Sequence, residues 1–562
     1  MPRGGPFEHR VEQLGPAPVI RHFLDRTHLP ELLRRHLSPP VALRALLLLH
    51  NLLLAREPLY ALPDWASTYP PRALGRPDDR PLRFTDDQLG RTLDHLFDLD
   101  RASLLTEIVV RVIREFHLDL KELHNDSTTV TFSGAYRKAD GRRQRGQPTV
   151  AITFGKNKDH RPDLKQLLWS LTATVDGMVP IHYRVYDGNT NDSPTHWDTW
   201  TALRGLVGRP DFLYVADSKL CAEGVLRRID SESGRFLTVC PRTRKEDGMF
   251  REWVQHHPVE WSEVERRATP SGESDVWRMA ESPIPAADGF RLVWIWSTGM
   301  ARVEREAREE TIGRALLRLG ELDKRLQSPR SRYRTAEAVR AAGSRALGPR
   351  AERWLEVELR EETVTSYHQA GPGRPGKSTR YRQVERKRFR VSGRPLRERI
   401  EWDGRQDGMF PLLTNDRELS LAELLTSYRW QPTLEKRHEQ LKTAYSVAPM
   451  LLKKITRIEG LLFVYFLALL VEALMEREVR RGMAQRGLDS IPLYPEARPC
   501  EAPTADRVLE AFAGVSRYHL TAEGREVQRF EPELTSIQRQ LLELLGVPEG
   551  EYESPRSIEP AN

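Results

Sequence analysis

The segment LHNDSTTVTF (123–132) places an acid, Asp126, inside a run of β-branched residues. Such a run favours a β-strand, whereas Asp disfavours one, so the acid carries a cost that a function can justify. Three further segments are also typical of strands: PTVAITF (148–154), LLWSLTATVDG (167–177) and PIHYRVYDG (180–188). We therefore expect Asp126 on the first strand of a sheet, with a hairpin at Asp176-Gly177 between the last two strands.

A second acid ends a later strand. DSPTHWDTWTALRGLVG (192–208) is typical of a helix, and DFLYVAD (211–217) is a short apolar strand that ends in Asp217. FLTVCP (236–241) predicts one more strand. Strands followed by a helix and further strands predict a mixed α/β core. Because open α/β sheets bind ligands at the carboxyl ends of their strands, Asp217 is a candidate functional residue.

A third acid, Glu435, lies in a helical region that opens with the capping box Ser420-x-x-Glu423. Pro432 predicts a break in this region and the start of a new helix. Lys442 follows Glu435 by two helical turns, so we expect both side chains on one face.

Acids from separate parts of a chain suit phosphodiester chemistry. This chemistry uses two divalent ions about 3.5–4 Å apart, one for the attacking oxygen and one for the leaving oxygen. Mg²⁺ prefers oxygen ligands and takes only a few carboxylates from the protein. Asp126, Asp217 and Glu435 are therefore the candidate catalytic and metal-binding residues.

A resemblance to a known family lies in the spacing Tyr428-x2-Gln431-x3-Glu435-x6-Lys442. It resembles the Tyr-Arg-Glu-Lys signature of one branch of bacterial insertion-sequence DDE transposases. Other segments are similar to that family as well: GKNKDHRPDLKQ (155–166), VDGMVPI (175–181), DGNTND (187–192), VADSKL (215–220) and DGMFPLLTN (407–415). The family commonly carries an insertion domain in the interval between Asp217 and Glu435.

The resemblance implies an α/β fold with a ribonuclease H-like mixed sheet core. A helical N-terminal domain, an inserted α+β domain and a helical C-terminal region complete the expected fold. The expected domains are a DNA-end-binding helical domain at 1–115, the two parts of the core at 116–241 and 406–480, the insertion domain at 242–405 and a helical tail at 481–562.

The resemblance also implies an activity and its residues. Asp126, Asp217 and Glu435 would hold two Mg²⁺ ions, with Mn²⁺ able to substitute. The expected enzyme is a DNA transposase that hydrolyses a phosphodiester at each end of an insertion sequence and then transfers the freed 3′-hydroxyl to target DNA. It would act on double-stranded DNA, both terminal inverted repeats and target, as a homodimer.

The signature also supplies candidate DNA-binding residues. Tyr428 and Lys442 would hold phosphates, the first through its hydroxyl and the second as a point charge. The family's Arg position holds Gln431, which donates a hydrogen bond but brings no charge; Arg429 offers a charge two residues earlier.

Two basic segments are further candidates for DNA contact. Lys156 and Lys158 lie in a loop after a strand, and Arg386, Lys387 and Arg388 lie in a basic strand-like segment that could follow a phosphate backbone. A charged hairpin facing only solvent is the alternative for the second segment.

Composition narrows the partners and the compartment. The net charge of +7 is compatible with a polyanionic partner, and the three cysteines are far apart, which excludes a disulfide scaffold and suits a reducing cytoplasm. The longest apolar run, Leu461 to Val471, is too short to span a bilayer. We expect it to pack against the sheet, with a dimer interface as the alternative. A cytoplasmic protein with no membrane partner is expected, and the family resemblance implies that it is bacterial and associated with DNA.

One motif points to a nucleotide and is rejected. GPGRPGKS (371–378) matches the phosphate-loop pattern, but Pro372 and Pro375 lack the amide hydrogens that cradle a phosphate. The segment after it is strand-like, where the motif requires a helix. No nucleotide partner is expected.

Two other functions remain open. The chain could be a catalytically impaired, transposase-derived DNA-binding protein, which the Gln431 substitution favours. It could also be a ribonuclease H-like nuclease without transposition, which would cut without regard to the flanking DNA.

Overall fold

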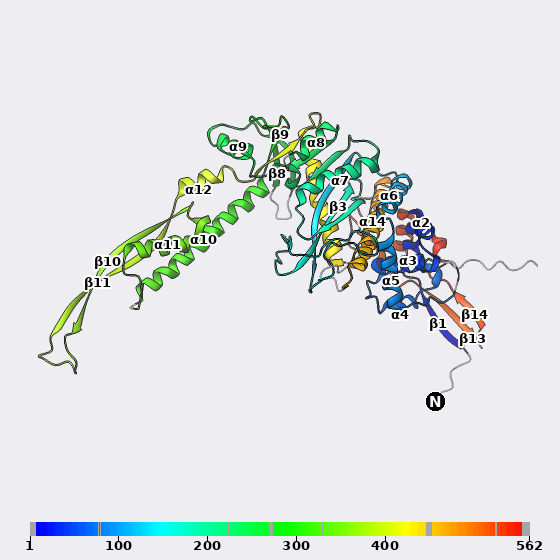
Figure 1. The fold of residues 1–562 in the computed structure, drawn as a ribbon, viewed down its shortest axis with the longest axis horizontal. Coiled ribbons are helices and arrows are strands. Elements are labelled where there is room, and N and C mark those ends of the chain that lie inside the picture. Colours follow the sequence, from blue (N-terminus) through cyan, green and yellow to red (C-terminus); the bar gives the residue numbers. More distant parts are fainter. Residues whose placement is uncertain are drawn as a thin grey trace, which may run out of the picture. The chain divides into compact units, whose positions relative to one another are not determined.

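The computed structural model describes residues 7–76, 78, 80–222, 224–268, 274–328, 330–444, 452–522 and 525–553. The chain folds as two compact units, which Figure 1 colours along the sequence. The first combines Met1–Thr238 with Thr426–Asn562, and the second is Val239–Leu425. The second unit is therefore inserted into the sequence of the first. The finer five-part division stays a prediction.

A mixed sheet forms the centre of the first unit, where its strand order is β4-β3-β2-β5-β6. The strands are β2 (Glu122–Phe132), β3 (Lys165–Thr174), β4 (Pro180–Asp187), β5 (Leu213–Ala216) and β6 (Arg235–Val239). β2 pairs antiparallel with β3 and parallel with β5, and β3 and β4 form the hairpin expected at Asp176-Gly177. The mixed α/β class is confirmed, and this order is compatible with a ribonuclease H-like core.

The central strand β2 is buried along almost its whole length, because Val, Thr and Phe side chains fill both of its faces. Only Glu122 and Asp126 are partly open to solvent. The acid singled out from the sequence thus opens to solvent from an otherwise buried strand.

The strand expected at 148–154 is not formed. This segment makes isolated bridges only, Asp140 with Ala151 and Thr153 with Gln166. The Ala151 amide donates to the Asp187 carboxylate at 2.7 Å instead of to a strand. The segment is therefore held by side chains and single bridges, which its β-rich composition does not reveal.

Helices surround the sheet of the first unit, including those expected before residue 116. They are α1 (Ala17–Arg26), α2 (Leu29–His36), α3 (Pro39–Leu54), α4 (Leu62–Ala66), α5 (Asp86–Asp98), α6 (Arg101–Phe116), α7 (Asp192–Val207), α8 (Val225–Ser231), α14 (Ile455–Gln485), α15 (Ala505–Glu510) and α16 (Ser536–Leu545). Short 3₁₀ turns lie at Pro71–Leu74, Ser218–Cys221, Pro495–Ala497 and Glu549–Tyr552.

The longest helix, α14, is the core of the helical part. Its most apolar window has a mean hydropathy of 2.1 and is 94% buried, which is the burial of a core helix. It packs against α3, α5 and α16, and Phe466 stacks on Tyr183 of β4 with ring centroids 4.9 Å apart. The core packing expected for Leu461–Val471 is confirmed.

The two ends of the chain are not wholly helical, contrary to expectation. A three-stranded sheet joins β1 (Phe7–Gln13), β13 (Ser516–Ala522) and β14 (Arg525–Phe530). β1 pairs antiparallel with β13 across more than five hundred residues of sequence. A pairing this distant has no local signature, so the two tails could not be recognised as partners.

Helix α13 (Leu421–Glu439) begins at the predicted capping box, where the Ser420 amide donates to Glu423 at 2.8 Å. The break expected at Pro432 is absent, and the helix continues through it. A proline removes one backbone hydrogen bond from a helix. Side-chain contacts on both sides of Pro432, described below, hold the two halves in line. A π-helical turn, Gln440–Ala444, follows.

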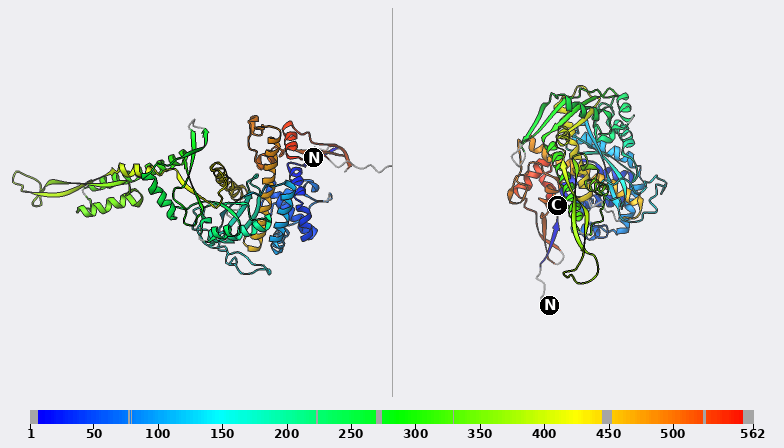
Figure 2. Two further views of the ribbon diagram at one scale, coloured as in Figure 1. Left: turned by 90° about the horizontal axis from the view of Figure 1, so that it is seen from above. Right: turned by 90° about the vertical axis from the view of Figure 1, so that its left-hand side faces the viewer.

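The second unit contains a sheet and a long hairpin. Its sheet strands, in the order β12-β9-β8-β7, are β7 (Ser262–Ala268), β8 (Ser274–Glu281), β9 (Arg291–Ser297) and β12 (Met409–Thr414). The helices are α9 (Lys245–His256), α10 (Thr298–Gln327), α11 (Ala336–Ala351) and α12 (Arg397–Gly404). β10 (Leu355–Gln369) and β11 (Tyr381–Pro395) form the hairpin beside α10 and α11 (Figure 2).

Truncation of Phe466 tests the core role of α14. The side chain is fully buried, so Phe466→Ala is expected to lower the free energy of unfolding by about 3–5 kcal/mol. Urea unfolding followed by circular dichroism measures this change. The control Tyr60→Ala, at a side chain that is 76% exposed, should stay within about 0.5 kcal/mol of the wild type. Equal effects of the two variants would contradict the assignment of α14 as core.

Candidate functional site

Asp126 lies between Lys158 and His438. Its Oδ1 is 3.6 Å from Lys158 Nζ, and its Oδ2 is 3.4 Å from His438 Nε2. Burial raises the pKa of the Asp126 carboxyl, but His438 and Lys158 lower it by more. The resulting pKa is about 2. Asp126 is therefore an anion at neutral pH, the form that binds a cation.

Lys158 is fixed in place by the strand that carries Asp126. Its ammonium donates to the main-chain oxygen of Ser127 and, at 2.9 Å, to the Ser127 hydroxyl. The Lys158 amide also donates to Thr129 at 3.3 Å. These contacts make Lys158 a partner of the acid, although Lys158 and Lys156 are both exposed. DNA contact by either lysine stays a prediction.

Asp217 lies next to Asp126 in the sheet register. Asn125 of β2 is the parallel partner of Ala216 at the end of β5, so the following residue on each chain is an acid. The Asp217 carboxylate accepts from the Lys219 amide at 3.0 Å and caps the short turn Ser218–Cys221. His196 Nε2 is 3.9 Å from Asp217 Oδ1. Neighbouring strands are about 4.8 Å apart, so the register brings the two aspartates to one place.

One face of helix α13 packs along strand β2. The Ser427 hydroxyl donates to Glu122 at 2.8 Å, and the Gln431 amide donates to the Asn125 main-chain oxygen at 3.0 Å. His438, two turns after Gln431, approaches Asp126 as described above. Residues spaced by three or four share a helical face. Glu435, four residues after Gln431 and three before His438, is therefore on the face that meets β2.

Glu435 itself is exposed at this face. Burial raises the pKa of the half-buried Tyr428 hydroxyl, and the negative charge of Glu435 raises it further. Tyr428 thus stays a neutral hydrogen-bond donor near the acid at physiological pH. Lys442 lies beyond the helix, where its ammonium is 2.5 Å from Asp159 of the basic loop.

Gln431 occupies the position where the sequence signature has an arginine. Its carbonyl is 3.2 Å from His124 Nδ1, and its amide group donates to the β2 main chain. Both ends of the side chain are thus used to hold α13 on β2. The structure gives Gln431 a positioning contact, and its predicted contact with DNA stays a prediction.

The carboxylates suit a hard cation in their chemistry. Oxygen donors that are ionised at neutral pH are the ligands that Mg²⁺ prefers. Among the described residues, however, no group of three His, Cys, Asp or Glu side chains lies close enough to hold a metal ion. The carboxylate donors fit Mg²⁺ in their chemistry. The register of β2 and β5 places Asp126 and Asp217 side by side, and Glu435 is on the face of α13 that meets β2, but the three do not form a preassembled metal site.

Sequence reasoning missed the histidines of this region. His438, His124 and His196 all lie beside the candidate acids or their supports, and all three are buried. His438 follows Glu435 by three residues, so helical spacing was the signal that could have found it.

The predicted basic residues of the second unit lie on β11. Arg386 and Lys387 are exposed and Arg388 is half-buried. Lys387 pairs with Glu361 of β10 at 2.6 Å. The phosphate-loop-like segment 371–378 lies in the turn between β10 and β11, and a strand follows it.

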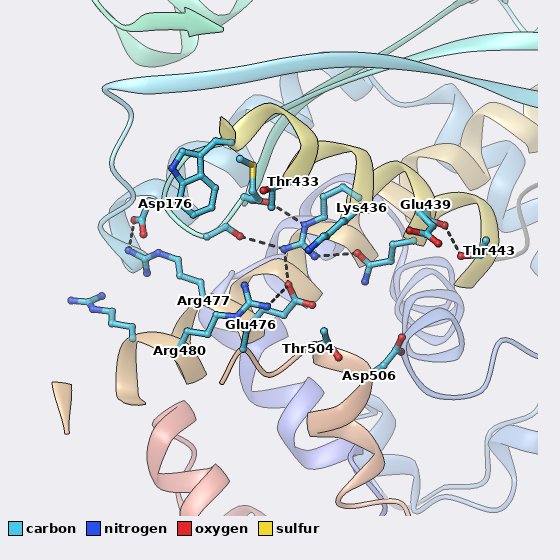
Figure 3. Close-up of a pocket in the computed structure, with 17 residues that line it drawn as sticks. Asp176, Thr433, Lys436, Glu439, Thr443, Glu476, Arg477, Arg480, Thr504 and Asp506 are labelled. Atoms are coloured by element: carbon cyan, nitrogen blue, oxygen red, sulfur yellow. Dashed lines mark hydrogen bonds and ion pairs between the residues drawn. The ribbon is translucent and has the colours of Figure 1, made fainter. Parts of the chain in front are cut away.

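The opposite face of α13 lines a cavity of about 940 Å³ (Figure 3). Arg437 spans it, donating to the Met178 main-chain oxygen at 3.2 Å and pairing with Glu476 of α14 at 2.8 Å. Arg477 pairs with Asp176 at 2.6 Å, as Figure 3 shows. These ion pairs join α13, the β3–β4 turn and α14. One face of α13 thus contacts the strand that carries Asp126, and the opposite face is held to α14 by ion pairs.

A family model and a solved structure match parts of this chain. Residues 19–110 match a family described as a domain of unknown function, DUF4277. No curated protein matches the chain. The chain also matches a cryo-EM structure of the piggyBac transposase synaptic complex with hairpin DNA, at 8% identity and a TM-score of 0.37. The match covers 88% of this chain and 76% of the other.

Substitution of Arg437 tests whether its ion pair with Glu476 holds α13 against α14. Both side chains are buried, so Arg437→Met leaves the Glu476 carboxylate with Arg480, at 3.6 Å, as its remaining ion-pair partner and is expected to cost about 2–3 kcal/mol of unfolding free energy. Chemical denaturation measures this loss. Arg481→Met, at a side chain 47% exposed, is the control and should change stability by less than about 1 kcal/mol. A mild effect of Arg437→Met would remove Arg437 as an anchor of the helix.

Proposed function

We propose that the chain is a DDE transposase that cleaves DNA strands at the ends of an insertion sequence and joins them to target DNA. One observation carries the proposal: Asp126, an ionised acid open to solvent in a buried strand, is in register with Asp217 and faces the helical surface that bears Glu435. The sequence signature around Glu435 supports the same function.

Asp126, Asp217 and Glu435 would together hold two Mg²⁺ ions, with Mn²⁺ able to substitute. The chemistry supplied by such a pair of ions is activation of the attacking oxygen and stabilisation of the leaving oxygen. The protein keeps Asp126 ionised through Lys158 and His438, and it holds Asp217 through the Lys219 amide. In the first reaction a water oxygen attacks phosphorus and frees a 3′-hydroxyl. In the second that hydroxyl attacks a target phosphorus, forms a new phosphodiester and displaces the 3′-oxygen of the target strand, which leaves as a 3′-hydroxyl.

The DNA partners follow from the charged groups around the acids. Tyr428, Arg429 and Lys442 lie on or just after α13, and Lys156 and Lys158 lie in the loop that Lys442 contacts through Asp159. These groups would hold phosphates on either side of the scissile bond. The helices of 1–115 would bind the terminal inverted repeats, and two copies would hold the two ends. A bacterial cytoplasmic location is part of this proposal.

A second candidate is a transposase-derived DNA-binding protein that no longer cuts. Gln431 favours it, because the residue that replaces the signature arginine has no charge and is bound to β2. Such a protein would bind the same DNA ends without needing a metal ion.

Cleavage mapping separates these functions. Purified protein with Mg²⁺ and DNA that carries both flanks of the gene is expected to produce cuts at the element ends. EDTA, Asp217→Asn and Glu435→Gln should each reduce cutting by at least about 10³-fold, because loss of a metal ligand removes transition-state stabilisation. DNA binding, measured by gel shift, should change less than about threefold.

The matched control is Asp198→Asn, an exposed acid of α7 that pairs with Arg184. It should cut as the wild type does. Binding at the ends without cutting by any protein would identify the DNA-binding alternative. Cutting that ignores the flanking sequence would identify a ribonuclease H-like nuclease.

His438 is expected to act as a positioning residue for Asp126. His438→Gln removes the imidazole that lies 3.4 Å from the carboxylate, so the Mg²⁺ concentration for half-maximal cleavage should rise about 10–100-fold. Cleavage rates over a Mg²⁺ series measure this shift, and His257→Gln, an exposed histidine of the second unit, is the control. An unchanged Mg²⁺ dependence with a lower maximal rate would contradict the role.

A further inference from the structure

The hairpin of β10 and β11 has two different faces. Both strands have 15 residues and pair antiparallel from Leu355↔Pro395 to Gln369↔Tyr381. Phe389 and Val391 face the helices and pack in a core cluster with Leu322 and Leu326 of α10. Because strand side chains alternate between faces, the odd-numbered residues share this helix-facing side and the even-numbered residues form the outer side.

The far part of the hairpin lies beyond its helical support. Beyond Phe389 toward the turn, no described residue of either strand is buried. Gln327, the last residue of α10, donates to the Phe389 main-chain oxygen at 2.9 Å, which marks where the support ends. Figures 1 and 2 show the hairpin extending past α10 and α11. Isolated two-stranded hairpins are marginal in water, so this segment gains from a bound partner.

The charges of the far part are divided between its faces. The outer face carries Arg382, Arg386 and Arg388 along β11, with Glu362 opposite Arg388. The helix-facing side carries Lys387, which pairs with Glu361, and the further acid Glu385. The three basic residues that follow one another in sequence therefore do not act together: two lie on a basic face and one on a neutralised face.

Nearer the helical support, the charge of the outer face is balanced. Arg390 of β11 is the cross-strand partner of Arg360, and its guanidinium pairs with Asp323 of α10 at 3.4 Å and with Glu362 at 4.0 Å. The basic charge of the outer face is therefore concentrated in the far part, at Arg382, Arg386 and Arg388.

We propose that the outer face of the β10–β11 hairpin binds the phosphate backbone of duplex DNA without regard to sequence. A two-stranded ribbon fits the major groove of B-DNA, which is about 12 Å wide. Arg386 and Arg388 are two residues apart, about 6.8 Å along the strand, so both can meet phosphates from one side of the ribbon. The proposal deepens the proposed function by assigning a DNA-holding surface to the second unit, and it rests on that function for the identity of the polyanion.

The test is the salt dependence of binding to a 30-base-pair duplex that lacks the element ends, in EDTA, with the full-length protein. The triple variant R382Q/R386Q/R388Q is expected to bind about 10–100-fold more weakly at 0.1 M KCl. Its slope of log K against log [KCl] should be shallower by about 2.7, since each lost phosphate contact removes about 0.9. The control triple R314Q/R340Q/R345Q removes the same charge from exposed positions of α10 and α11 and should lose less than about threefold.

A single-residue comparison tests the division between faces. Arg386→Gln should weaken binding several-fold, whereas Lys387→Gln, its neighbour on the other face, should not. Equal losses in the two triples, or in the two single variants, would overturn the proposal. So would tighter, outer-face-dependent binding of an RNA duplex than of the DNA duplex.

The binding and cleavage results separate the two proposals. An unaltered slope in the hairpin triple, with cutting still lost in Asp217→Asn, overturns the hairpin proposal alone. The expected slope change, with no cutting by the wild type, supports the hairpin and overturns the enzyme.

Discussion

The candidate site depends on how α13 is held against β2. Gln431 places its amide on the Asn125 main chain and its carbonyl near His124, so the helix is fixed at the strand that carries Asp126. The opposite face is fastened by the buried Arg437–Glu476 pair. A helix held on two faces cannot rotate, and Glu435 therefore keeps its place on the face of α13 that meets β2, even though Pro432 removes a hydrogen bond from the helix.

Electrostatic balance is the second condition of the site. Carboxylates gathered in one place repel one another, and burial alone would raise the pKa of Asp126. Lys158 and His438 reverse that effect and hold the acid ionised. Both are attached to structure that would remain when a cation binds: Lys158 to Ser127 of β2, and His438 to α13. The protein thus supplies charge compensation before a metal or DNA is present.

Much of the core could be predicted from the sequence because its signals are local. The run of β-branched residues in β2, the turn at Asp176-Gly177 and the capping box at Ser420 each depend on a few neighbouring residues. The features that the sequence did not predict depend instead on contacts between residues far apart in the chain. Residues 148–154 are β-rich but are held by side chains, and β1 finds its partner at the other end of the chain. His438 was missed because a histidine beside an acid on a helix has meaning only once the facing strand is known.

The basic residues 386–388 on β11 show that neighbours in sequence can lie in different chemical surroundings. Arg386, Lys387 and Arg388 are equivalent as a string of charges, but the two-residue period of a strand sends the middle one to the other face. There Glu361 neutralises it, while the two arginines join Arg382 on the outer face. Nearer the helices, Arg390 of the same face is balanced by Asp323 and Glu362. The cationic charge that a polyanion can meet therefore lies in the far part of the outer face, where the strand period gathers Arg382, Arg386 and Arg388.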